Sequence, residues 1–355
     1  MQNDHNGNAI TAPQTKKRID WVDCAKGIAI ILVLIGHTVT FDTESQRLAR
    51  GIIFSFHMPL FFILSSLTFK FSESSQDFIR KTKKAFFHLI IPLLILFGIR
   101  IGIDVAKKFS TIDPLPYISF RINQLVYSSG VEVKVGGGTV AAIGALWFLV
   151  VLFCSRTFYD YLHLKLKPAA FYVWIAICSI IGLLLCNVQW LPLSFDVALA
   201  ILPLMLFGTL LKKINIEKLT VLFMLISLGV WAATFFSVYY GNYGYMELSA
   251  RRYTLFPLCY VTAIAGTMFV SYAGHYISKL LFIGKGIVWL GKYSLYLYMV
   301  HELDGNIKFL WDFTQNKWIQ IAIRLAVDII ICIILVNIIK AISSARKKGE
   351  IKKIK

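Results

Sequence analysis

Charged residues are scarce in this chain of 355 residues: they make up 16%, against 57% hydrophobic residues. The mean hydropathy is +0.67. A water-soluble domain carries nearer ~25% charged residues. Several apolar runs approach or exceed the roughly 20 residues that cross a bilayer as a helix. The composition therefore predicts a membrane protein.

Acidic residues are the scarcest charged class, since 19 Asp and Glu stand against 37 Lys and Arg and give a net charge of +18. Such an excess raises nucleic acid as a partner. Here the basic residues alternate with apolar segments, a pattern that the positive-inside rule explains better. We therefore expect a lipid bilayer as a partner and no nucleic acid.

Several motifs are missing as well. The absence of GxSxG, HExxH and GxxxxGK[ST] argues against the usual serine hydrolases, zinc proteases and ATP-driven pumps. The six cysteines include no CxxC pair and lie in or beside apolar segments, so we interpret them as small buried side chains and expect no metal. The polar residues 1–17 contain no apolar signal-peptide core, which predicts that the first apolar segment stays in the membrane.

The apolar segments predict an all-α fold, a polytopic transmembrane helical bundle of about ten spans. Between a disordered cytoplasmic segment (1–17) and a basic cytoplasmic tail (343–355), we place a membrane domain at 18–342. Of the 37 basic residues, 25 lie nearer one face, so both termini are expected in the cytoplasm and the protein in a bacterial inner or plasma membrane. The predicted spans are 22–41, 51–69, 85–105, 144–162, 169–187, 196–211, 219–240, 253–273, 286–303 and 319–342.

The longest connection, 107–144, falls on the outer side and contains two prolines and the run Gly136–Gly138. A connection of this length is longer than a simple turn, and we interpret it as a lid or a substrate-facing loop.

Two histidines stand in apolar stretches, His37 in the first span and His57 in the second. An ionisable side chain at membrane depth costs about 2.5 kcal/mol or more, so it usually faces the bundle interior and marks a functional pathway. Lys26 precedes His37 by eleven residues, or roughly 16 Å along a helix. One group is therefore expected near the cytoplasmic face and the other near the opposite face.

Other polar residues fall in the same outer third once alternating directions are assigned to the spans. Convergence in depth is what a single polar cavity would produce, because polar groups in lipid pair with one another or with water. These residues are Arg100, Asp104, Trp147, Asp196, Arg251, Arg252, His301 and Glu302.

Each of these residues also has a structural interpretation. His57 could bond a carbonyl freed by Pro59. Arg100 and Asp104 have i,i+4 spacing, and we favour a structural ion pair. Arg251 and Arg252 could be boundary charges, Trp147 an interfacial aromatic, and His301 with Glu302 a pair at the span end. Only His37 has no local carboxylate or other evident reason to be there. Histidine is the usual general base near neutral pH.

At these residues the chain resembles the acyltransferase-3 family of membrane proteins, and within it the fucose 4-O-acetylase-like branch. The segment RIDWVDCAKGIAIILVLIGH matches the family pattern of a cation, ten residues and a histidine, here Lys26 and His37. FHMPLFFILSS resembles the second motif, with Ser65–Ser66 where a relative more often has Ser-Gly. Weaker likenesses are LWFL at Trp147, RRYTLFPL at Arg252 and LGKYSLYLYMVH ending at His301.

The resemblance implies transfer of an acyl group, usually acetyl, from cytoplasmic acyl-CoA to a hydroxyl of a cell-envelope glycan. It implies catalytic roles for His37 and His57 and places Lys26, near Asp23, on the donor side. The acceptor or the cavity wall would then involve Trp147, Arg252, His301, Glu302, Asp196 and Arg100.

Two other functions compete with this one. A transporter or flippase of polysaccharide or lipid-linked sugar also needs a polar cavity, but it more often shows inverted repeats, and the sequence has none that we detect. A membrane sensor or anchor would need a partner protein. The acceptor sugar, the acyl group and homo-oligomer formation are left open by the sequence.

Overall fold

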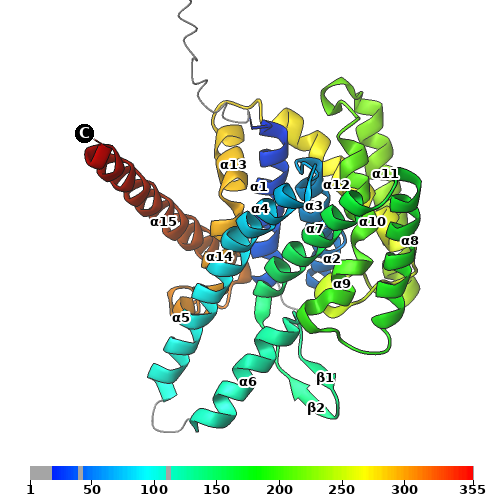
Figure 1. Ribbon diagram of the computed structural model, residues 1–355. Coiled ribbons are helices and arrows are strands. Elements are labelled where there is room, and N and C mark those ends of the chain that lie inside the picture. The colour runs from blue at the N-terminus through cyan, green and yellow to red at the C-terminus, as the bar shows by residue number, and fades with distance from the viewer. Residues whose placement is uncertain (1–17, 39–42, 109–112, 355) are drawn as a thin grey trace, which may run out of the picture.

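The computed structural model describes residues 18–38, 43–108 and 113–354, and most of this part of the chain is helical (Figure 1). The α-helices are α1 (Asp20–Thr38), α2 (Glu44–Phe54), α3 (His57–Leu67), α4 (Ser75–Ala85), α5 (Ile91–Lys108), α6 (Pro114–Tyr127), α7 (Trp147–Lys165), α8 (Pro168–Leu185), α9 (Phe195–Ala200), α10 (Leu202–Leu211), α11 (Val221–Val238), α12 (Leu258–Ile277), α13 (Ile283–Lys292), α14 (Ser294–Leu303) and α15 (Lys317–Ile354).

Short elements complete the described chain. Two strands, β1 (Val133–Val135) and β2 (Gly138–Val140), form an antiparallel hairpin. The short 3-10 and π turns are η1 (Phe86–Ile90), η2 (Gly144–Leu146), η3 (Pro192–Ser194), η4 (Ile216–Lys218), η5 (Tyr239–Tyr243), η6 (Leu248–Ala250) and η7 (Asp304–Leu310).

Every predicted span overlaps a helix or a broken helix, which makes the protein an all-α polytopic membrane protein, and residues 39–41 of the first span lie outside the described residues. Among the described residues, seven helices are long and apolar enough to cross a bilayer, or eight if the bent pair α9–α10 is one span. Two predicted spans fall outside this count: α12, which covers the eighth, is not among these helices, and the ninth is split into α13 and α14 at Tyr293, neither of which is long enough alone. Ten spans therefore stay a prediction.

Prolines explain irregularities in three helices. Proline lacks the N–H that would bond the carbonyl four residues earlier. Pro59 leaves the carbonyl of Ser55 free where α2 gives way to α3, and Pro203 follows the 52° bend between α9 and α10. Pro92 likewise cannot bond the carbonyl of His88, and the helix runs through the π turn η1 there.

Burial separates the helices into a centre and a periphery. In an apolar 18-residue stretch of α1, α2–α3 and α7, 61–67% of the residues are buried, whereas in the corresponding stretch of α4–α5, α8, α11 and α15 only 17–28% are buried. The exposed positions of the peripheral helices are largely Ile, Leu and Phe. We interpret these apolar outer faces as the surface that meets lipid, with α1 lying inside against α3, α12 and α13.

The connection 107–144 contains structure of its own. Helix α6 and the β1–β2 hairpin lie at the end of the bundle opposite the start of α1 (Figure 1). Arg121 of α6 forms an ion pair with Asp104 of α5, and the Gln124 amide donates to the carbonyl oxygen of Ala142 at 2.9 Å. The described part of this connection is therefore an ordered cap. At the other end of the chain, α15 continues through the predicted basic tail as far as Ile354.

The closest helix contact lies between α1 and α13 and depends on glycine. A Cβ atom on Gly291 would lie 1.6 Å from the carbonyl oxygen of Asp23, and one on Gly27 would lie 2.1 Å from that of Ile287. Small residues allow membrane helices to approach this closely.

Gly291→Ala should therefore destabilise the bundle. Overpacking costs typically about 1–3 kcal/mol, and here the obstructing atom is backbone, which cannot rotate away. The melting temperature of the purified protein in detergent measures the effect. Gly286→Ala on the same helix is the control, because a Cβ there meets nothing within 4 Å. Equal melting temperatures for the two variants would contradict this account of the contact.

Candidate functional site

A polar cavity of about 460 Å³ is lined in part by Gly130, Val131 and Gly144, which belong to the connection that carries α6 and the hairpin. We call it the outer cavity. Five of the side chains expected from the sequence line it together, namely His37, His57, Trp147, His301 and Glu302. They come from α1, α3, α7 and α14, so segments far apart in sequence build one site. The convergence in depth expected from the sequence is present for these five residues.

His37 stands in the last turn of α1, and its side chain is exposed within the outer cavity. Its ring lies 5.3 Å from that of His301 and 5.9 Å from that of Phe54, measured between centroids. An exposed imidazole at the wall of a cavity can reach a bound molecule. The position of His37 therefore allows a role in a reaction, and not only a role in packing.

His57 begins α3 and is buried. Its Nδ1 lies 2.9 Å from the carbonyl oxygen of Ile53, so this nitrogen carries the proton and donates it. Its Nε2 is consequently the acceptor nitrogen. The alternative drawn from the sequence is half right: His57 does bond a carbonyl, but that of Ile53 rather than that of Ser55, which Pro59 frees.

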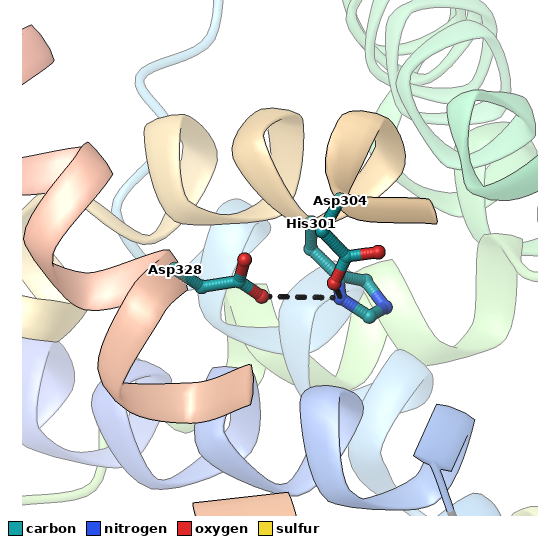
Figure 2. Close-up of side chains that lie close together, drawn as sticks. All are labelled: His301, Asp304 and Asp328. Carbon is teal, nitrogen blue, oxygen red and sulfur yellow. Dashed lines mark hydrogen bonds and ion pairs between the residues drawn. The ribbon is translucent and has the colours of Figure 1, made fainter. Parts of the chain in front are cut away.

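His301 is held by two carboxylates from different elements (Figure 2). Its Nδ1 lies 3.0 Å from Asp304 Oδ2 and 3.4 Å from Asp328 Oδ2, and all three side chains are buried. Figure 2 shows the other ring nitrogen on the side facing away from Asp328. A carboxylate on one imidazole nitrogen fixes the tautomer and leaves the other nitrogen for the cavity.

Arg324 completes this cluster. Its Nε and Nη2 donate to the two oxygens of Asp304 at 2.5 and 2.7 Å, and its Nη1 donates to the Thr38 hydroxyl at 3.0 Å. One guanidinium offsets one of the two carboxylates, so a neutral cluster needs one further proton, on His301 or on Asp328. We define this set of His301, Asp304, Arg324 and Asp328 as the charge cluster.

The charge cluster also has the ligand types of a metal site. Ligand atoms of His301, Asp304 and Asp328 lie within 4.8 Å of one another. Both oxygens of Asp304, however, already accept hydrogen bonds from Arg324, and a cation bound here would lie close to that guanidinium. The geometry therefore suits an ion-pair network better than a metal ion.

Glu302 and His301 are neighbours in the chain but have different partners. Glu302 accepts hydrogen bonds from Arg100 at 3.1 Å and from the backbone N–H of Ala145 at 2.8 Å. The alternative of a His301–Glu302 pair, left open by the sequence, is therefore wrong. So is the Arg100–Asp104 pair, because Asp104 forms its ion pair with Arg121. Arg100 supports the wall of the outer cavity through Glu302.

Asp196 and Arg252 lie outside the lining of the outer cavity. Asp196 is fully buried and forms an ion pair of 2.9 Å with Arg251, whose guanidinium also covers the Trp190 ring at 3.9 Å. Arg252 is largely exposed and lies 3.6 Å from Glu247, which does line the cavity. The structure thus gives Arg251 a buried structural partner and places Arg252 at the surface.

A second cavity, of about 390 Å³, lies nearer the start of α1, and we call it the inner cavity. Its basic lining residues are Arg18, Lys26, His88, Arg156 and Lys292. Asp23 forms its ion pair with Arg18 at 2.7 Å, and this hydrogen bond raises the pKa of the Arg18 guanidinium.

The inner and outer cavities share two lining residues, Met58 and Tyr298. The Tyr298 hydroxyl donates to the carbonyl oxygen of Ala145, which fixes the ring beside the outer cavity. Met58 and Tyr298 therefore lie where the basic cavity and the histidine-lined cavity adjoin. A flexible substrate arm could pass between them after a rotamer change of Met58.

Fold and site together define an integral membrane protein with a basic chamber and a histidine-lined chamber in contact. A family model described as an acyltransferase domain, acyltransferase-3, matches residues 19–339. The chain therefore belongs to the acyltransferase-3 family and is a membrane acyltransferase. A search of curated proteins found no match.

Sequence reasoning overlooked much of the charge cluster. Arg324 and Asp328 stand inside the predicted span 319–342, where charged side chains are costly, so their presence was a usable signal. The outer cavity is also lined by Arg50 of α2, Tyr298 and Asp304. Their positions in the sequence gave less reason to expect a functional role.

Arg324→Met should strongly destabilise the protein. Removing one partner of a buried ion pair typically costs 3–5 kcal/mol, because the remaining carboxylates lose their countercharge. The double variant Arg324→Met/Asp304→Asn should recover a large part of the lost stability. Melting temperatures in detergent test both expectations. A single variant as stable as the wild type, or a double variant no better than the single one, would contradict the account.

Proposed function

We propose that this protein is an O-acyltransferase that moves an acyl group, preferably acetyl, from cytoplasmic acyl-CoA to a hydroxyl of a cell-envelope glycan. The observation that carries the proposal is the contact of two chemically different cavities at Met58 and Tyr298. One cavity is basic and suits a phosphorylated donor. The other holds three histidines and suits proton transfer to and from a hydroxyl.

The donor would enter from the side where α1 begins. The phosphates of CoA are attracted by the cations at the inner cavity, among them Lys26 and Arg18. Lys26 and His37 are separated by eleven residues on α1, which is roughly 16 Å along the helix axis. An extended pantetheine arm spans a distance of the same order. The thioester can thus meet the outer cavity while the nucleotide stays on the side where α1 begins.

The acyl transfer itself needs a base, and His37 is our candidate. It would take the proton of the acceptor hydroxyl as the hydroxyl oxygen attacks the thioester carbonyl carbon. The C–S bond then breaks, and the proton passes from His37 to the sulfur, which leaves as CoA-SH. No oxidant or metal is needed for this balance. His301 lies close enough, at 5.3 Å between ring centroids, to influence the charge on His37.

His57 and His301 would support this step. His57 presents its unprotonated Nε2, because Nδ1 is committed to the Ile53 carbonyl. It would orient the acceptor by accepting a hydrogen bond from one of its hydroxyl groups. His301, anchored by Asp304, supplies a second imidazole of fixed tautomer.

The acceptor would bind from the side of α6 and the hairpin. Trp147 offers an aromatic face in the outer cavity, and Glu302 offers a carboxylate that can accept sugar hydroxyls. The resemblance to the fucose 4-O-acetylase-like branch also favours a sugar hydroxyl.

His37→Ala should abolish acyl transfer while the protein stays folded. A general base typically contributes 10²–10⁴-fold, so the loss should fall at least in that range. Release of free CoA from acetyl-CoA by purified protein, with candidate glycans present, measures it. His163→Ala is the control, because that histidine lies outside both cavities and stacks on Phe71. Near-normal turnover by a folded His37→Ala protein would refute the role of His37.

The proposed orientation has its own test. Thr139→Cys, on the exposed hairpin, should react with a membrane-impermeant maleimide in intact cells. Gln76→Cys, exposed at the start of α4, should react only after permeabilisation. The unaltered chain, with its native cysteines, sets the background. The reverse labelling pattern would mean that the outer cavity faces the cytoplasm.

A further inference from the structure

A third cavity, of about 300 Å³, lies beside the inner cavity and, like it, is lined by five basic residues. We call it the side pocket. Its basic lining residues are Lys70, Lys81, Lys84, His88 and Arg156. Two of these, His88 and Arg156, also line the inner cavity, so the two spaces adjoin. A molecule with an anionic head and a long arm could occupy both.

Arg156 has an unusual environment for a cation. It lies on α7, and its Nε is buried and makes no hydrogen bond with any described residue. Its guanidinium stands 5.1 Å from the centroid of the Phe69 ring. The carboxylate one turn further on, Asp160, accepts hydrogen bonds of 2.8 and 2.6 Å from the backbone and hydroxyl of Ser72. Among the described residues no ion pair involves Arg156, and its guanidinium therefore has capacity to bind an anion.

His88 reaches the same junction because of a local irregularity. It lies in the π turn η1, where Pro92 cannot supply the N–H that would bond the His88 carbonyl. Such π turns inside helices are frequent at functional sites. The irregularity turns the helix so that His88 borders both the side pocket and the inner cavity.

We infer that the side pocket binds the phosphates of the nucleotide part of the donor, with Arg156 as their principal anchor. This inference rests on the proposed function. Arginine presents a rigid fork of donors that matches phosphate oxygens. The one carboxylate of the side pocket, Asp160, is already engaged by Ser72. The donor arm would then run past His88 into the inner cavity toward Met58.

This assignment differs from one centred on Lys26. The cavity on the other side of Lys26, of about 690 Å³, is also basic, but it contains the carboxylates of Asp23 and Glu217. A polyphosphate would meet repulsion there. Lys26 instead borders the path of the donor arm through the inner cavity. Lys212 lines the 690 Å³ cavity, so a variant at Lys212 tests whether the nucleotide binds there instead.

Two acetyl donors distinguish phosphate binding by Arg156 from a structural role of this residue. Acetyl-CoA carries the nucleotide phosphates, and S-acetylpantetheine lacks every phosphate. Arg156→Ala should raise the KM for acetyl-CoA about 10- to 100-fold, the range of one or two lost charged hydrogen bonds. It should leave kcat/KM for S-acetylpantetheine unchanged, and Arg156→Lys should fall between. Lys165→Ala, an exposed cation at the end of α7 outside the cavities, is the control.

An equal loss for both donors would show that Arg156 acts on the fold and would overturn the inference. A larger KM effect from Lys212→Ala than from Arg156→Ala would overturn it too.

Binding of adenosine 3′,5′-bisphosphate by calorimetry tests the side pocket without turnover. Wild type should bind it at least about tenfold more tightly than Arg156→Ala, while Lys165→Ala should match wild type. Equal affinity of wild type and Arg156→Ala would refute the site. If bisphosphate binds through Arg156 but wild type releases no CoA from acetyl-CoA, the proposed acyl transfer fails while the phosphate site stands.

Discussion

Charged groups within the bilayer must find partners, and this requirement organises the outer half of the molecule. Arg324 on α15 bonds both oxygens of Asp304 and the hydroxyl of Thr38, and so joins three segments at one point. Asp304 and Asp328 in turn hold His301. Since a buried charge without its partner is strongly destabilising, these pairs specify how α14 and α15 meet α1. The histidine that faces the cavity is positioned by the same bonds.

Helix α1 links this outer cluster to the donor side. Its residues border the inner cavity at Lys26 and the outer cavity at His37. Its close contact with α13, at Gly27 and Gly291, gives it little freedom to slide. The separation between Lys26, on the path of the donor arm, and His37, the candidate base, is therefore set by one rigid helix. Met58 and Tyr298 lie between the two cavities, and in our proposal the thioester crosses at that position.

The helices could be predicted from the sequence because an apolar run of sufficient length is by itself the signal of a membrane-spanning helix. The partners of the charges could not, because pairing depends on elements distant in the chain. Arg100 has a carboxylate one turn away at Asp104, yet it pairs with Glu302, 202 residues further on. Asp104 is taken by Arg121, from a segment that reads as a loop. His37, His57 and His301 were found because histidine is rare in such segments. Arg324 and Asp328 stand in an equally apolar span, where charged side chains are just as costly, and they could have been found by the same argument.

The central claim is that an acyl group passes from one face of the bundle to an acceptor at the other. Proteoliposomes with protein of known orientation test it most directly, with acetyl-CoA confined to the side where α1 begins and glycan acceptors to the opposite side. The account predicts acetylated glycan on the acceptor side and free CoA on the donor side in equal amounts. Passage of unmodified glycan across the bilayer, with no release of CoA, would contradict it and identify a transporter.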